Sequence, residues 1–291
     1  MKPNPPSTLS SRLEKIPAVV LLMLAIASLQ VGGALAVGLF KHLGPLGTVT
    51  LRVSIAAVIL LLLGRPRLDR QVRANWVPLA LFGLSIAGMN LCIYQAFARI
   101  PFGAAVTLEL IGPLSLSVLF SRRGRDFVWA GLAVLGVLLL TPLTGASPDP
   151  VGVWYALAAG VCWAAYARLG ALVGSRLPGG AGLSLGIGIA ALVMLPIGIW
   201  SAGATLLQPS LLAVGFLIAL ASTVIPFSLE FEALRRLPAR TYGILVSIDP
   251  AAAAITGAVL LHQPLTLRTF AAVVCVVAAA VGVTLTAQSD R

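Results

Sequence analysis

The chain has few charged residues: Asp, Glu, Lys and Arg make up 10% of its 291 residues, whereas 59% of the residues are hydrophobic. Ordinary soluble domains carry about 25% charged residues. So few charges could not cover the surface of a soluble domain. The composition therefore excludes that class and indicates a protein that lies in a lipid bilayer.

Acidic residues are especially scarce, with 9 Asp and Glu against 20 Lys and Arg, which gives a formal net charge of +11. A basic chain that binds nucleic acid gathers its charge on one face, together with aromatic or polar side chains that read the bases. Here the basic residues stand in short clusters between long apolar runs. This pattern is typical of membrane-protein loops, and we expect no nucleic-acid partner.

Cysteine and histidine are also rare. Cys92, Cys162 and Cys275 lie inside apolar runs without a CxxC pair, and His42 and His262 fall in short connections. This pattern indicates neither a disulfide framework nor a metal site, and we expect no cofactor. The chain also lacks a phosphate-binding loop of the form GxxxxGK[ST], which argues against an ATP-driven pump.

Long apolar runs, bounded by charge, proline or glycine, fill most of the chain. A helix needs about 20 apolar residues to cross the hydrocarbon core, and tightly packed transporters also contain shorter ones. The sequence therefore predicts an all-α polytopic membrane protein with ten transmembrane helices. The predicted spans are residues 17–37, 46–63, 75–95, 104–120, 127–142, 151–171, 181–200, 211–230, 240–260 and 267–286.

The first span resembles a signal peptide, because basic residues precede it and Ala-Leu-Ala stands at 34–36. Its apolar run of about 20 residues is longer than the ~7–15 residues usual for a signal peptide. We therefore expect this segment to be retained as the first helix.

Lys and Arg are distributed unevenly between the two sides of the predicted helices. If the N-terminus is cytoplasmic, the clusters at 65–73 and 122–125 lie inside with most of the other basic residues. Only Lys41, Arg99 and Arg268 then lie outside. Cytoplasmic loops carry the excess of positive charge, so we expect both termini to be cytoplasmic.

The two halves of the chain resemble each other. Residues 90–113, NLCIYQAFARIPFGAAVTLELIGP, align without a gap with residues 227–250, FSLEFEALRRLPARTYGILVSIDP. The identical pairs are Ala96/Ala233, Arg99/Arg236, Pro101/Pro238, Leu108/Leu245, Ile111/Ile248 and Pro113/Pro250. This similarity predicts two five-helix repeats, at 17–142 and 151–286, between the cytoplasmic segments 1–16 and 287–291.

Each predicted repeat has an odd number of helices, so the second repeat enters the membrane from the opposite side. Inverted repeats are typical of secondary transporters, in which the two halves exchange conformations to give alternating access. The repeat therefore favours transport. A receptor or purely structural role would not need it, and a membrane enzyme acting on lipid would need a nucleophile–base set or a metal cluster, which the sequence does not contain.

Charged residues inside the predicted spans are candidates for function. A charge at the bilayer centre costs at least about 2.5–3.5 kcal/mol, so Arg52, Glu109 and Asp249 should face a cavity or a partner. Glu230 and Glu232 stand near the inner end of the eighth span. They either face the same cavity or pair with the neighbouring arginines at 235–236 at the membrane surface.

Arg52 and Glu109 are predicted at the same depth, about 8–9 Å below the outer end of their helices at ~1.5 Å per residue. Two interpretations remain open. In the functional one, Arg52 binds a substrate carboxylate, while Glu109 or Asp249 binds an amino group or carries a proton. In the other, Arg52 and Glu109 form a static ion pair that fixes the helix register.

Three prolines stand inside the predicted spans, and a proline cannot donate a hydrogen bond to the carbonyl four residues earlier. A carbonyl freed in this way within lipid needs another partner or a wet cavity. The three prolines, each with the residue whose carbonyl it frees, are Pro113 with Glu109, Pro250 with Val246, and Pro226 with Ser222. We predict hinges and binding-site backbone at these positions.

Other polar and aromatic residues within the spans either contact the substrate or pack and anchor helices at the membrane interface. These weaker candidates are Gln30, Asn90, Tyr94, Gln95, Trp163 and Tyr166.

Four stretches carry a resemblance to a known family: ASLQVGGALAVGLF at 27–40, GMNLCIYQ at 88–95, FGAAVTLELIGPLSLSVLFSRRGRDFVWAGLAVLG at 102–136 and STVIPFSLEFEALRRLPARTYGILVSIDPAAAA at 222–254. They resemble the EamA-type branch of the drug/metabolite transporter superfamily, and within it the bacterial threonine/homoserine exporters of the RhtA type. The resemblance covers nearly the whole chain.

This resemblance implies ten helices in two inverted repeats and a bacterial inner-membrane location. It also implies a transporter, not an enzyme, that exports small amino acids, driven by the proton gradient. Glu109, Pro113, Arg52 and Glu230 correspond to the family's motif residues, whereas Asp249 stands where we expect Glu in close relatives. The alternative within the same fold is efflux of another metabolite or an amphipathic drug.

Overall fold

In the computed structural model, the described residues form helices joined by turns and short connections, without a β-strand. These residues are 16–66, 68–119, 124–140, 149–177, 180–234, 236–237, 242 and 245–286. The predicted terminal segments, apart from Ile16, lie outside the described residues, as does Arg235.

The first half of the chain contains six described helices. They are α2 (Ala18–Val37), α3 (Phe40–Gly64), the short α4 (Arg70–Ala74), α5 (Trp76–Phe97), α6 (Phe102–Leu119) and α7 (Gly124–Leu140).

The second half continues the helical pattern. Its elements are α8 (Pro150–Arg176), α9 (Ala181–Ala202), the 3-10 turn η1 (Gly203–Leu207), α10 (Pro209–Ala219), the π-helical turn η2 (Leu220–Val224), α11 (Ile225–Leu234), α13 (Asp249–Leu260) and α14 (Leu267–Thr286). Each predicted span therefore overlaps helical structure.

Six described segments are long and apolar enough to cross a membrane, namely Ala18–Val37, Phe40–Gly64, Trp76–Phe97, Pro150–Arg176, Ala181–Leu207 and Pro209–Glu230. Three shorter helices, Phe102–Gly112, Asp249–Leu260 and Leu267–Gly282, are also apolar. Large apolar side chains such as Leu62, Leu192 and Val259 remain exposed on the outside of the bundle, which suits a lipid environment. The protein is a multi-pass membrane protein, while the count of ten spans stays a prediction.

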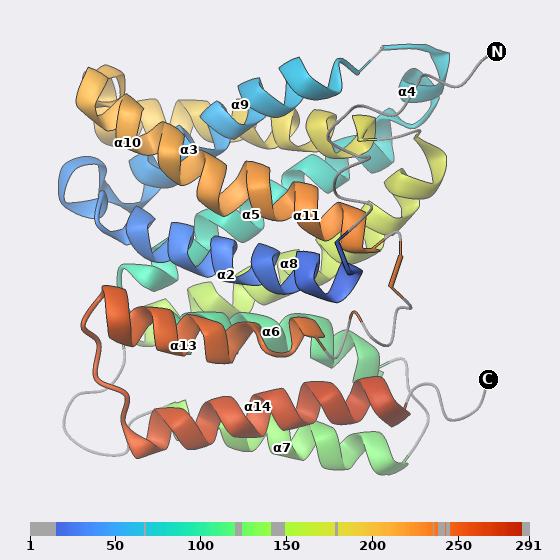
Figure 1. The fold of residues 1–291 in the computed structure, drawn as a ribbon, viewed down its shortest axis with the longest axis vertical. Helices are drawn as coiled ribbons and strands as arrows, with labels where there is room; N and C mark the ends of the chain where they lie inside the picture. Colours follow the sequence, from blue (N-terminus) through green and yellow to red (C-terminus); the bar gives the residue numbers. More distant parts are fainter. Residues whose placement is uncertain are drawn as a thin grey trace.

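Helices from the two halves of the chain pack against one another. α5 contacts α8, α3 contacts α9, and α2 contacts α11 and α13. Figure 1 shows α7 beside α14 at one edge of the molecule, next to α6 and α13. The start of α2 and the end of α14 lie on the same side of the bundle (Figure 1). The center of the bundle is therefore enclosed by segments that are far apart in the sequence.

Local sequence sets where several helices begin. Asp149 caps α8 by accepting a hydrogen bond from the amide of Val151 at 2.9 Å, and Pro150 occupies the first turn, where its missing N–H is harmless. Within α3, Gly44 has a φ of 65° and precedes Pro45, a backbone conformation that glycine adopts readily. The helix therefore bends there, ahead of the predicted span at 46–63.

Two predicted spans differ from continuous helices. Within 240–260, Ser247 and Ile248 form a turn, and α13 begins only at Asp249. Pro250 therefore lies in the first turn of a helix and not inside one, because its fixed φ and missing N–H suit a helix start. Within 211–230, the backbone passes through η2 before Pro226, consistent with the tendency of prolines and π-turns to bend helices.

Candidate functional site

The bundle encloses a cavity of about 130 Å³ between helices of both halves. Nine of the candidate residues for substrate binding or proton coupling line it: Gln30, Arg52, Asn90, Tyr94, Glu109, Trp163, Tyr166, Glu230 and Asp249. The helices α2, α3, α5, α6, α8, α11 and α13 supply these side chains. The cavity therefore gathers one arginine and three carboxylates from positions that are distant in sequence.

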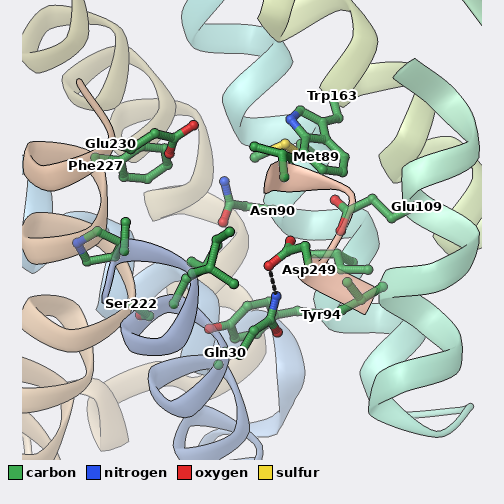
Figure 2. Close-up of a pocket in the computed structure, with 18 of the residues that line it drawn as sticks. Gln30, Met89, Asn90, Tyr94, Glu109, Trp163, Ser222, Phe227, Glu230 and Asp249 are labelled. Atoms are coloured by element: carbon green, nitrogen blue, oxygen red, sulfur yellow. Dashed lines mark hydrogen bonds between the residues drawn. The ribbon is translucent and has the colours of Figure 1, made fainter. Parts of the chain in front are cut away.

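The three carboxylates occupy different parts of the cavity. Figure 2 shows Glu109 and Asp249 on one side of the cavity, with the Asp249 carboxylate directed at Gln30, while Glu230 lies on the other side near Phe227. Asp249 is buried and accepts a hydrogen bond from Nε2 of the buried Gln30 at 2.7 Å (Figure 2). A hydrogen bond to an ionised group is stronger than one between neutral groups, so Gln30 fixes the position of the Asp249 side chain.

Arg52 is 5% exposed and is surrounded by uncharged acceptors. Its Nη1 donates to the Ser222 carbonyl at 3.2 Å, to Ser222 Oγ at 3.3 Å and to Thr223 Oγ1 at 3.1 Å. Its Nη2 donates to Asn90 Oδ1, and its guanidinium carbon lies 5.0 Å from the centre of the Tyr94 ring. Arg52 is thus held by two separate elements, η2 and α5.

The structure argues against the static pair of Arg52 and Glu109, which was one of the two interpretations that the sequence left open. No ion pair joins these two residues in the described part of the chain, although both line the cavity. The equal predicted depth of Arg52 and Glu109 did not determine which residues pair. Arg52 instead points toward η2 on the neighbouring helix. A buried arginine without a carboxylate partner is available to an anionic ligand.

The position of Pro226 explains why Arg52 donates hydrogen bonds to η2. Without an N–H, Pro226 cannot donate to the carbonyls of Ala221 or Ser222, which lie five and four residues earlier. Ser28 Oγ of α2 donates to the Ala221 carbonyl at 2.6 Å, and Arg52 donates to that of Ser222. The predicted need for outside partners at the Ser222 carbonyl is therefore confirmed.

The carbonyl of Glu109 faces a close helix crossing. A Cβ atom built on Gly160 of α8 would lie 2.5 Å from this carbonyl oxygen, and one built on Gly112 would lie 2.0 Å from the carbonyl oxygen of Gly160. Only residues without a side chain allow two helices to approach so closely. Pro113 lies one residue beyond this crossing in α6.

The remaining predicted polar residues separate into cavity and surface groups. Glu232 accepts a hydrogen bond from Arg236, which follows α11, with Arg236 Nε at 3.0 Å from Oε1, and this confirms the predicted pairing of Glu232 with a neighbouring arginine. Glu230 instead accepts a hydrogen bond from the Tyr242 hydroxyl and lines the cavity. Gln95 bonds Arg99 one turn later and lies outside the cavity, so its candidacy for substrate contact was wrong.

Sequence reasoning missed several cavity residues, chiefly Met89 and Phe227, and it named Ser222 only for its backbone carbonyl. It also missed Thr223, which holds Arg52 from beside the cavity. The sequence signal that could have identified Ser222 and Thr223 is their position as hydroxyl residues four and three positions before Pro226. Met and Phe side chains give no such signal, because either one also suits lipid or core packing. Within the described residues, no group of three or more His, Cys, Asp or Glu side chains could hold a metal ion.

The helical fold and its cavity, which holds buried charged side chains, have the form of a membrane transporter, and the comparisons with known proteins agree. A model of the EamA-like transporter family matches residues 150–285. A solved crystal structure superposes with a TM-score of 0.64 over 93% of this chain and 97% of its own, at 20% identity, and so supports the fold alone.

Sequence comparison then gives the branch. The chain is 40% identical over 283 residues, 96% of both chains, to the threonine/homoserine exporter RhtA of Escherichia coli (strain K12). It is 39% identical over 274 residues, covering 94% of this chain and 92% of the relative, to the threonine/homoserine exporter RhtA of Salmonella typhimurium (strain LT2). The chain belongs to the EamA-like transporter family and is similar to its RhtA exporters, which supports transport and not catalysis.

Proposed function

We propose that this protein exports small amino acids, of the threonine and homoserine type, across the bacterial cytoplasmic membrane by proton-coupled antiport. The observation that carries the proposal is the cavity, in which the buried Arg52 has no carboxylate partner among the described residues, while Glu109, Asp249 and Glu230 line other parts of the cavity. The names of the RhtA relatives supply the substrate class.

A zwitterionic amino acid complements this arrangement of charges. Its carboxylate is suited to the planar donor edge of Arg52, because guanidinium groups bind carboxylates through paired N–H donors. Its ammonium group is suited to a carboxylate such as Asp249 or Glu109. Both groups of the ligand would then gain a partner in a region where an unpaired charge is costly.

The size of the cavity favours a small metabolite over an amphipathic drug. A cavity of about 150 Å³ holds a molecule the size of benzene, whereas sites for drug-sized ligands are about 300–1,000 Å³. The cavity here is about 130 Å³. Its size supports an amino acid with a short side chain, and efflux of bulkier compounds remains the alternative.

Glu109 and Asp249 are the groups that we propose for proton coupling. They lie on the same side of the cavity (Figure 2), and two negative charges repel strongly where the dielectric constant is low. A proton shared by the pair removes that repulsion, and an ammonium group bound there would do the same. Proton and substrate would then compete for one site, which is the requirement for antiport.

Contacts at the two ends of the bundle support the inverted repeat. Arg99, after α5, lies 3.4 Å from the carboxylate of Asp149, the residue that precedes α8. Its repeat counterpart Arg236, after α11, donates at 3.3 Å to the carbonyl of Ile16, shortly before α2. In each case the third helix of one proposed repeat is tied to the first helix of the other. We infer that the repeats span 17–142 and 151–286.

The proposed orientation places both termini in the cytoplasm. It rests on the excess of Lys and Arg in the loops that would lie inside. It is compatible with the start of α2 and the end of α14 lying on one side of the bundle (Figure 1).

The proposal is tested with purified protein in liposomes, measuring uptake of labelled threonine and homoserine with an acidic interior and with equal pH on both sides. We expect uptake above the equilibrium level only with the pH gradient. Glu109→Gln should abolish this accumulation but keep exchange of labelled for unlabelled threonine, whereas Glu232→Gln, at the surface ion pair, should behave as wild type. Absence of threonine movement would contradict the substrate class, and accumulation by Glu109→Gln would contradict the role of Glu109.

A further inference from the structure

Two hydrogen-bond donors beside the cavity have no partner. Arg52 Nε and the hydroxyl of Tyr94 are both buried, and neither makes a hydrogen bond within the described part of the chain. Both residues line the cavity, and the Arg52 guanidinium lies over the Tyr94 ring. Buried polar groups are almost always paired in native proteins, so two unpaired donors in adjacent side chains require an explanation.

The other nitrogens of Arg52 are already occupied. Nη1 faces the acceptors of Ser222 and Thr223, and Nη2 donates to Asn90. Asn90 is itself fixed, because its amide nitrogen donates to the Ile86 carbonyl at 2.9 Å. These contacts prevent the guanidinium from turning to satisfy Nε. The edge that carries Nε is therefore left for a group that the described residues do not provide.

The chemistry of the two free donors selects the missing group. A guanidinium only donates hydrogen bonds, and a tyrosine hydroxyl readily donates one to an anion. A carboxylate accepts through both of its oxygens and carries the charge opposite to that of Arg52. A carboxamide offers one acceptor and would place its own N–H₂ against a donor. The pair thus matches a carboxylate and disfavours its amide.

We propose that Tyr94 determines specificity for the carboxylate of the transported substrate. Its hydroxyl and Arg52 Nε are the two groups that donate hydrogen bonds to this carboxylate when the cavity closes around the substrate. This assignment rests on the proposed function and adds a named recognition group to it. Ser222, Thr223 and Asn90 act as positioning residues, because they hold the remainder of the guanidinium and contact the carboxylate only through Arg52.

The test is Tyr94→Phe, which removes only the hydroxyl oxygen and keeps the ring beneath Arg52. Transport of labelled threonine and of labelled threoninamide is measured in liposomes. The matched control is Tyr155→Phe, since the Tyr155 ring packs under Arg99 outside the cavity. Unchanged thermal unfolding of both variants in detergent shows that they fold.

We expect Tyr94→Phe to raise the KM for threonine by about tenfold, the size of effect typical for losing a hydrogen bond to a charged group. The KM for threoninamide should change by less than about twofold, so the preference for the acid over the amide falls by the same tenfold factor. Tyr155→Phe should keep the wild-type preference.

Two results would overturn the assignment while leaving the proposed function intact. One is a threonine KM for Tyr94→Phe equal to that of wild type. The other is an equal loss for acid and amide, which would mean that the hydroxyl has only a structural role. If wild-type protein moves no threonine at all, the proposed function itself fails, and the carboxylate assignment fails with it.

Discussion

The contact between Arg52 and Thr223 gives a quantitative test of how η2 positions the arginine. Thr223→Val replaces a hydroxyl by a methyl group of similar volume, so the packing of this 3% exposed side chain is retained. Among the described residues, the one side-chain hydrogen bond that it removes is that from Arg52 Nη1 to Thr223 Oγ1 at 3.1 Å. The change therefore isolates one of the acceptors that hold the guanidinium.

The expected magnitude follows from the other contacts of Nη1. A hydrogen bond to a charged group contributes about 1.5–3 kcal/mol. Nη1 would still face the carbonyl and hydroxyl of Ser222 at 3.2 and 3.3 Å, so we expect a loss at the lower end of that range. Since about 1.4 kcal/mol corresponds to a tenfold change in affinity, the KM for threonine should rise by roughly tenfold.

The assay is the initial rate of threonine transport in liposomes as a function of substrate concentration. Thr48→Val is the matched control, because Thr48 is equally buried but bonds only the Gly44 carbonyl of its own helix, at 2.7 Å. We expect this control to keep the wild-type KM. Equal KM values for the Thr223 and Thr48 variants would refute the conclusion that η2 positions Arg52 for substrate.

The remaining predictions concern the close crossing of α6 and α8 and the hydrogen bond between Gln30 and Asp249. Gly160→Ala should lower the stability of the protein by about 1–3 kcal/mol through overpacking, because the new Cβ would lie 2.5 Å from the Glu109 carbonyl oxygen. Thermal unfolding in detergent measures this loss of stability. The control is Gly174→Ala, where a new Cβ would meet no neighbouring atom within 4 Å, and it should show no comparable loss. Equal stability of the two variants would contradict a tight crossing. Gln30→Leu should reduce transport at least ~10-fold by leaving the buried Asp249 without its donor, and normal transport by that variant would show that the Gln30 contact is dispensable.

The candidate residues were predictable because the membrane restricts polar groups so strongly. Nine of the candidate residues line the cavity, since a charged or strongly polar side chain within a span has few acceptable locations apart from a cavity or a partner. The prediction was weakest where a side chain stands near the end of a span. Gln95 and Glu232 are such residues, and both bond arginines at the ends of helices.

Sequence by itself determined the helical membrane architecture and the position of each apolar segment, because hydrophobic length and the fixed rise of a helix are local properties. It also determined that the Ser222 carbonyl would need an outside partner, because Pro226 has no N–H. Only the tertiary structure decided that Arg52 supplies this partner and leaves Glu109 on the same side of the cavity as Asp249. Depth is fixed along one helix, whereas the direction in which a side chain points, and what it meets there, depends on how separate helices rotate and pack against one another.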